Sequence, residues 1–199
     1  MKDTIRFVLT LALVTLVSAF LLSYLYTKVE GNIEKQKKAK LENAIKYVLN
    51  TEEFEKVEGE KTSYWKIPGN DDKFAVRCSS QGFDGLIDSV VGINREGEIL
   101  KIKVIQQQET PGLGAKMDAV KSNKYIWDFI TGKKREKLDP TPYFQKQFFG
   151  EKYEDLEVVK QPSDDPGSIE ALTGATISSK AVVQGIKDGA KKLMEEVNK

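Results

Sequence analysis

Residues 86–106 read LIDSVVGINREGEILKIKVIQ, and this stretch carries the strongest signal for the fold. Two segments rich in β-branched residues, 86–93 and 99–106, flank the sequence NREG at 94–97, where Gly97 can adopt the positive φ of a hairpin loop. The second segment alternates apolar and polar side chains, so we expect one face of the sheet to be buried and the other to be solvated. The pattern predicts an antiparallel sheet.

Further strand-like segments lie on both sides of this hairpin, and they are SYWKI at 63–67, KFAVRC at 73–78 and LEVVK at 156–160. AVKSNKYIWDFI at 119–130 predicts a helix, and SDDPG at 163–167 predicts a turn. Apolar residues recur at helical spacing from Val182 to Val197, which predicts a C-terminal helix. The expected fold class is therefore α+β, with an antiparallel sheet and flanking helices.

The most apolar part of the chain lies near its N-terminus. Residues 7–26 read FVLTLALVTLVSAFLLSYLY, and at about 1.5 Å per residue this uncharged run spans a hydrocarbon core of about 30 Å. We expect a single transmembrane helix at 7–26, preceded by a short tail at 1–6. A cleaved signal peptide is the less favoured alternative, because its apolar region is usually about 7 to 15 residues long and no small-x-small site follows the run.

An amphipathic pattern continues beyond this span. Apolar residues recur at helical spacing from Ile33 to Val48 among lysines and glutamates, so we expect a stalk helix at 27–50. The stalk is either a solvated spacer or a surface that docks on a neighbouring membrane protein, and the domain proper spans 51–199. The lysines that follow the span would place this domain in the cytoplasm, although long domains can be translocated regardless of charge.

The composition excludes several classes of function. The 199 residues include 31 basic and 30 acidic side chains, a balance that gives no nucleic-acid footprint, so we expect no nucleic acid as a partner. Histidine is absent from the sequence and Cys78 is its only cysteine, so zinc, haem and iron–sulfur clusters are poor candidates and we expect no metal site. Cys78 is expected to be a buried structural residue. Redox chemistry here would need an organic cofactor.

The stretch EALTGATISS at 170–179 has four hydroxyl side chains around a Gly-Ala pair, and they belong to Thr173, Thr176, Ser178 and Ser179. The stretch precedes the predicted C-terminal helix, so capping of that helix by a hydroxyl is the simplest interpretation. One helix needs only one cap, however, and a helix N-terminus also attracts anions. A phosphate could lie there as a dissociable ligand or as an ester of one of these hydroxyls.

Catalysis by one of these hydroxyls is disfavoured. No histidine can serve as a base, and the Ser-x-x-Lys spacing fails because Ile177 stands three residues before Lys180. The sequence GLGAKM at 112–117 also lacks the spacing of a P-loop. We therefore expect no catalytic residue and no independent enzyme activity in this chain.

Three blocks of sequence together resemble the FMN-binding domain found in the G subunit of the Rnf complex and in the C subunit of the sodium-pumping NADH:quinone oxidoreductase. TGAT at 173–176 resembles the family's (Ser/Thr)-Gly-Ala-Thr motif, ETPGLG at 109–114 resembles its Glu-Thr-Pro-Gly-Leu-Gly loop, and QGFDGLI at 81–87 resembles its Gly-aromatic-x-Gly stretch. In that family a flavin transferase esterifies FMN through its phosphate to the last threonine of the first motif. The matching residue here is Thr176, and Glu170 replaces the aspartate that usually stands six residues before it.

The resemblance implies a function and a cellular setting. We expect an electron-transfer subunit of the Rnf ion-translocating ferredoxin:NAD⁺ oxidoreductase complex, with FMN bound covalently to Thr176. The alternatives are the C subunit of the Na⁺-translocating NADH:quinone oxidoreductase, which is usually longer, and a membrane-anchored anion-binding or scaffolding module without covalent flavin. The implied location is the cytoplasmic membrane with the domain outside the cytoplasm. The implied partners are the other membrane subunits, including the second covalent-FMN subunit, and a flavin transferase for maturation.

The resemblance also implies which residues bind the flavin besides Thr176, and these are Thr173, Gly174, Ala175, Ser178, Glu109, Thr110, Gly112, Leu113 and Gly114. Two roles remain open for Glu109: its carboxylate either bonds a main-chain amide of its own loop or borders the flavin ring. The structural role is the favoured one.

Overall fold

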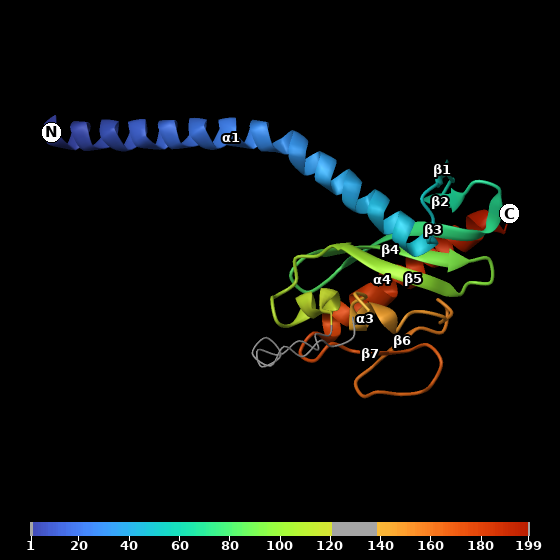
Figure 1. Cartoon of the computed structure of the whole chain (residues 1–199). Helices are drawn as coiled ribbons and strands as arrows, with labels where there is room; N and C mark the ends of the chain where they lie inside the picture. Colours follow the sequence, from blue (N-terminus) through green and yellow to red (C-terminus); the bar gives the residue numbers. More distant parts are fainter. Residues whose placement is uncertain (1, 121–138, 199) are drawn as a thin grey trace, which may run out of the picture. The chain divides into compact units, whose positions relative to one another are not determined.

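The computed structural model describes residues 2–120 and 139–198 of the chain (Figure 1). The chain forms two compact units, Met1–Lys40 and Leu41–Lys199, and helix α1, Lys2–Leu49, contributes to both. The helix predicted at 119–130 falls almost entirely on residues outside the described ranges.

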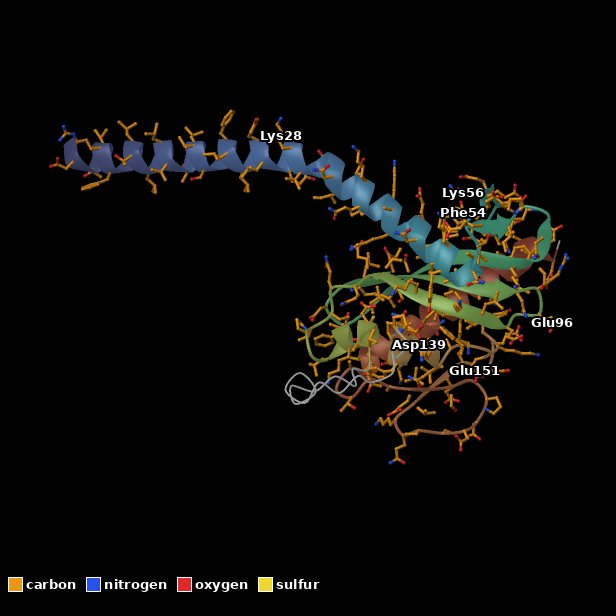
Figure 2. The ribbon with its side chains drawn as sticks, in the orientation of Figure 1. Lys28, Phe54, Lys56, Glu96, Asp139 and Glu151 are labelled. Atoms are coloured by element: carbon orange, nitrogen blue, oxygen red, sulfur yellow. The ribbon has the colours of Figure 1, made fainter. Side chains whose placement is uncertain are left out.

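The first unit consists of the N-terminal part of α1. Its apolar side chains are exposed, as at Leu16 and Phe20, whose exposed fractions are 69% and 75%. Figure 2 shows the side chains of this part, up to the labelled Lys28, projecting outward around the helix. Among the described residues, α1 is the one helix that is long and apolar enough to cross a membrane. Its N-terminal part therefore has the length and composition of the predicted transmembrane segment.

The second unit is built on a five-stranded sheet, whose strands are β1 Glu55–Glu58, β2 Ser63–Ile67, β3 Asn70–Gln81, β4 Leu86–Asn94 and β5 Ile99–Gln106. The strands follow one another in sequence order, and each pairs with the next in antiparallel fashion. Gly97 has a φ of 83° in the turn between β4 and β5, as the hairpin prediction requires. The predicted antiparallel sheet is confirmed.

Helix α4, Thr176–Val197, packs on one face of this sheet against β3 and β4. Its buried apolar residues recur at helical spacing and join Val76, Cys78 and Val91 of the strands in the larger core. Gly189 lets the helix approach the sheet closely, because a Cβ there would lie 2.3 Å from the sulfur of Cys78. Cys78 is buried, as expected.

The last turns of α1 lie beside the sheet (Figure 1) and cover part of its opposite face, forming a second core of Ala44, Ile45, Val48 and Leu49 with Trp65, Ala75 and Val90. A Cβ at Gly92 would lie 2.7 Å from the carbonyl oxygen of Val48, so the helix contacts the backbone of β4. Every residue of β4 from Ile87 to Ile93 is buried. The prediction of one solvated sheet face is therefore wrong where α1 packs.

The end of the predicted stalk thus belongs to the same compact unit as the sheet. The sequence placed the start of the domain at residue 51, whereas the compact unit begins at Leu41. An amphipathic stripe has the same pattern whether it faces a neighbouring protein or the chain's own sheet. Here, the end of the stripe packs on the chain's own strands.

Four short elements lie between β5 and α4 in the described part of the chain. The 3₁₀ helix η1, Gly114–Asp118, follows β5, and helix α3, Tyr143–Lys146, packs against η1. Strands β6, Glu157–Val159, and β7, Ser168–Glu170, form a parallel pair. β7 leads directly into the stretch that precedes α4, and Gly174 in this stretch lies against Leu113 in the loop after β5.

Candidate functional site

A pocket of about 380 Å³ lies at the N-terminal end of α4. Three segments that are distant in sequence line it, and the lining residues are Phe83, then Glu109, Thr110, Leu113 and Gly114, then Gly174, Ala175, Thr176, Ile177 and Ser178. The three sequence blocks singled out above therefore meet in one place. Two predicted site residues, Thr173 and Gly112, are exposed and are not among those that line the pocket.

Among the residues that the structure describes, no side chain caps the N-terminus of α4. The helix begins at Thr176, its N-cap residue is Ala175, and no side-chain hydrogen bond closes the first turn. The capping interpretation of the hydroxyl cluster is therefore wrong. The start of a 22-residue helix points into the pocket with its first-turn amides available to an anion.

Two of the four hydroxyls have structural partners instead. The Ser179 hydroxyl donates to the carbonyl oxygen of Ala175 and accepts from the amide of Leu172, both at 3.0 Å. The Ser178 hydroxyl donates to the carboxylate of Glu109. Ser178 and Ser179 are both buried, whereas Thr176 is half-buried at the pocket. Thr176 and Ser178 both line the pocket, but only the side chain of Thr176 is partly exposed there.

The turn before α4 depends on Gly174, which has a φ of 78°. This left-handed conformation is accessible to glycine at little cost. A Cβ at position 174 would lie 2.9 Å from Cδ2 of Leu113, so the turn packs directly against the 109–114 loop.

The 109–114 loop is itself tightly folded. The amides of Leu113 and Ala115 donate to the carbonyl oxygen of Thr110 at 3.1 and 3.3 Å, and Gly112 has a φ of 81°. The hydroxyl of Thr110 donates to the carboxylate of Asp84. The loop is therefore tied to the turn that contains Phe83, which lies on the pocket rim.

Glu109 lies at the centre of these contacts with an exposed fraction of 5%. Its Oε1 atom accepts from the amide of Asp84 at 3.2 Å, and its Oε2 atom accepts from the hydroxyl of Ser178. Glu109 does bond a main-chain amide, but that amide belongs to the 82–85 turn and not to its own loop. Glu109 is also among the residues that line the pocket. Asp84 was not among the predicted site residues, although it stands inside the QGFDGLI block.

The pocket is apolar at its rim, and the described residues that line it include no cationic group. The exposed fractions of Phe83, Ile177 and Leu113 are 67%, 58% and 43%. Of the pocket-lining residues that the structure describes, Glu109 is the only ionisable one. Within the described ranges, no group of three or more His, Cys, Asp and Glu side chains could hold a metal ion. The arrangement suits an apolar ring system attached to an anionic group at the helix N-terminus.

A larger hollow of about 660 Å³ runs along α4 between Ser79–Gln81 and Leu156–Val158. It shares Ile177 with the first pocket, but it contains none of the predicted site residues. The smaller pocket is therefore the candidate site.

Residues 82–191 match the family model described as the FMN-binding domain. The match covers more than half of the chain, and the chain belongs to this family.

Curated relatives extend the match beyond that domain. The G subunit of the proton-translocating ferredoxin:NAD⁺ oxidoreductase complex of Clostridium ljungdahlii is 29% identical over 186 residues, which are 92% of this chain and 88% of the relative. The G subunit of the ion-translocating oxidoreductase complex of Pasteurella multocida is 29% identical over 214 residues, covering 99% and 96% of the two chains. The expected resemblance to the G subunits is confirmed.

A solved structure supports the fold. The crystal structure of the C subunit of the Na⁺-translocating NADH-quinone reductase from Parabacteroides distasonis matches with a TM-score of 0.57 and 17% identity, over 84% of this chain and 96% of that chain. At this identity the match bears on the fold alone, and it agrees with the expected α+β class.

Proposed function

We propose that this chain is the membrane-anchored, electron-transferring G subunit of an Rnf-type ion-translocating oxidoreductase complex, with FMN esterified through its phosphate to Thr176. The observation that carries the proposal is the meeting of three family motifs in one pocket at the uncapped start of α4. The family match and the names of the curated relatives support the cofactor and the type of complex.

The residues present fit a phosphate ester at this position. Thr176 is the first residue of α4, so an ester on its hydroxyl lies beside the amides of the first helical turn. The positive end of the helix dipole stabilises an anion there by about 0.3–1 kcal/mol, and by up to about 2 kcal/mol in a partly buried setting. Phe83, Leu113 and Ile177 present apolar surface that can cover flavin rings. The pocket volume, about 380 Å³, also falls within the common range for small-molecule sites.

The charges of the pocket favour a covalent over a dissociable phosphate. Within the described part of the chain, a free phosphate group would be held by helix amides alone, because no lysine or arginine is among the pocket-lining residues there. Glu109 lines the same pocket, and its negatively charged carboxylate repels a phosphate group there. An ester bond makes retention independent of this weak anion affinity and keeps the flavin at a high effective concentration. These features favour the electron carrier over the anion-binding module.

The chain's own residues hold and orient the cofactor in this proposal. Bound FMN supplies one- and two-electron transfer. Thr176 provides the attachment oxygen, and Gly174 and Gly114 lie at the pocket without side chains that would obstruct a ligand. The described site requires none of these residues to act as an acid, a base or a nucleophile during electron transfer.

The proposal includes a setting in the cell. The apolar part of α1 anchors the chain in the cytoplasmic membrane as a single span, and the relatives are named as subunits of multi-subunit complexes. We place the domain outside the cytoplasm, against the count of lysines after the span, with the other membrane subunits, including the second covalent-FMN subunit, as partners. A flavin transferase attaches the FMN. Protease treatment of spheroplasts tests the orientation, because it should degrade the domain, and protection until the cells are lysed would contradict it.

The intact mass of the full chain, purified from membranes of its native host, tests the covalent link. The expected mass is that of the polypeptide plus one FMN ester, localised by peptide mapping to the fragment that contains Thr176. The denatured protein should also fluoresce under ultraviolet light in a gel. A bare polypeptide mass would refute the ester, and release of FMN on denaturation would support the dissociable alternative.

A further inference from the structure

The Glu109 carboxylate is a buried charge held by two neutral donors. Oε1 accepts from the amide of Asp84 at 3.2 Å, and Oε2 accepts from the hydroxyl of Ser178. Glu109, which carries this charge, has an exposed fraction of 5%.

The surroundings prevent this carboxylate from swinging away. A Cβ at Gly82 would lie 2.2 Å from Oε1, and a Cβ at Gly114 would lie 2.6 Å from Oε2. Backbone therefore packs against both oxygens, and the two hydrogen bonds fix their directions. The charge stays at one place beside the start of α4.

Glutamine would have nearly the same size and could also accept a hydrogen bond from the Asp84 amide. The Ser178 hydroxyl could turn to accept from the glutamine amide group, since a hydroxyl both donates and accepts. The packing at position 109 therefore does not require a charge. What distinguishes glutamate from glutamine here is its negative potential in a pocket whose described lining residues include no lysine or arginine.

We infer that Glu109 is a positioning residue of the flavin site whose fixed negative charge also lowers the midpoint potential of the bound flavin, an inference that rests on the proposed function. Each electron that arrives from a reduced partner adds one negative charge to the site unless a proton from solvent follows it. A carboxylate in a poorly solvated pocket opposes that added charge more strongly than an exposed one would. Glu109 thereby biases the site towards giving electrons to the next carrier.

The test compares the flavin midpoint potential of the full-length, flavin-loaded chain with that of three variants. Glu109→Gln removes the buried charge and keeps the shape. Asp84→Asn removes an exposed charge in the adjoining turn, and Ser178→Ala removes the hydrogen-bond donor while keeping the carboxylate. Potentials are measured by spectroelectrochemical titration, with loading checked by intact mass and folding by thermal melting.

We expect Glu109→Gln to raise the potential by about 59 mV, which corresponds to a tenfold change in a one-electron equilibrium. Asp84→Asn should shift it much less, because water screens that carboxylate. Ser178→Ala should lower the melting temperature without raising the potential. A loaded Glu109→Gln variant with the wild-type potential would overturn the inference.

If Glu109→Gln accumulates without flavin, Ser178→Ala decides the question, because a carboxylate that has lost this donor is less neutralised and should lower the potential, whereas an unchanged potential would overturn the inference. A raised potential in that variant, which keeps the carboxylate, would show that the hydrogen bond and not the charge sets the potential. The intact mass of the wild-type chain tests the proposed function separately. A wild-type chain without FMN at Thr176 would refute the proposed function itself.

Discussion

Ser178 and Glu109 lie 69 positions apart in the sequence and are joined by a hydrogen bond from the serine hydroxyl to the glutamate carboxylate. Gly114 lies against both side chains, because a Cβ at this position would be 2.6 Å from Oε2 of Glu109 and 2.9 Å from Oγ of Ser178. The bond between the two residues is therefore sensitive to any side chain at position 114.

Gly114→Ala should destabilise the domain by about 1–3 kcal/mol, the usual cost of overpacking a buried position, because the added methyl group must displace the Glu109–Ser178 pair. The free energy of unfolding in urea measures this, and the extent of flavin attachment should fall with it. Gly85→Ala is the matched control, since its Cβ would meet only the exposed side chain of Gln108, at 3.0 Å or more. Equal stability of the two variants would contradict the described packing.

Thr176→Val should abolish the FMN adduct and change the melting temperature by only a few degrees. Valine keeps the β-branched shape of threonine but has no oxygen to esterify. Intact mass of variants co-produced with a flavin transferase measures attachment directly. Thr173→Val is the control, because Thr173 is exposed and does not line the pocket, and it should retain the adduct. An adduct that persists in Thr176→Val would place the attachment on another residue.

The local parts of the fold could be predicted from the sequence. The hairpin of β4 and β5 follows from β-branched segments around Gly97, and the periodicity between Val182 and Val197 identifies the buried stripe of α4. The family resemblance supplied the three blocks that meet in the pocket. These signals lie within short windows, where residue type and spacing determine the conformation.

Contacts between distant segments could not be predicted in the same way. The hydroxyl cluster at the start of α4 indicated a cap, but Ser178 bonds Glu109, which is 69 positions away, and Ser179 bonds the nearby amide of Leu172. Hydroxyl residues at the start of a helix favour capping on average, and here one of them bonds a partner from a distant segment instead. The amphipathic end of α1 likewise gave no sign that its partner is the chain's own sheet.

Ile45→Ala should cost about 2–5 kcal/mol of unfolding free energy, because Ile45 has an exposed fraction of 1% in the second core. Ile33 stands on the same predicted stripe of the same helix but has an exposed fraction of 41%. Ile33→Ala should therefore change the stability by no more than about 0.5 kcal/mol. Chemical denaturation of both variants in detergent makes the comparison. Equal effects would mean that the end of α1 does not pack on the sheet.

Alkaline pH should destabilise the domain in part through Cys78. Burial raises the pKa of its thiol from the ordinary value of 9.0 to about 12. Well below pH 9 the thiol is protonated in both states and contributes no pH dependence. Between pH 9 and about 12 the unfolded chain has lost the proton while the native chain keeps it. Stability therefore falls as the pH rises through this window, because the unfolded state binds fewer protons than the native state.

Cys78→Ala isolates this contribution, since it removes the titrating thiol and leaves every other alkaline group in place. The free energy of unfolding of the wild type should fall more steeply between pH 8.5 and 10.5 than that of the variant, whatever the variant's stability at pH 8. A thiol reagent at pH 8 should label the native chain far more slowly than the chain in urea, because the thiolate is the reactive form and the native thiol is buried. Parallel pH profiles, or rapid labelling of the native protein, would show that Cys78 is in contact with solvent.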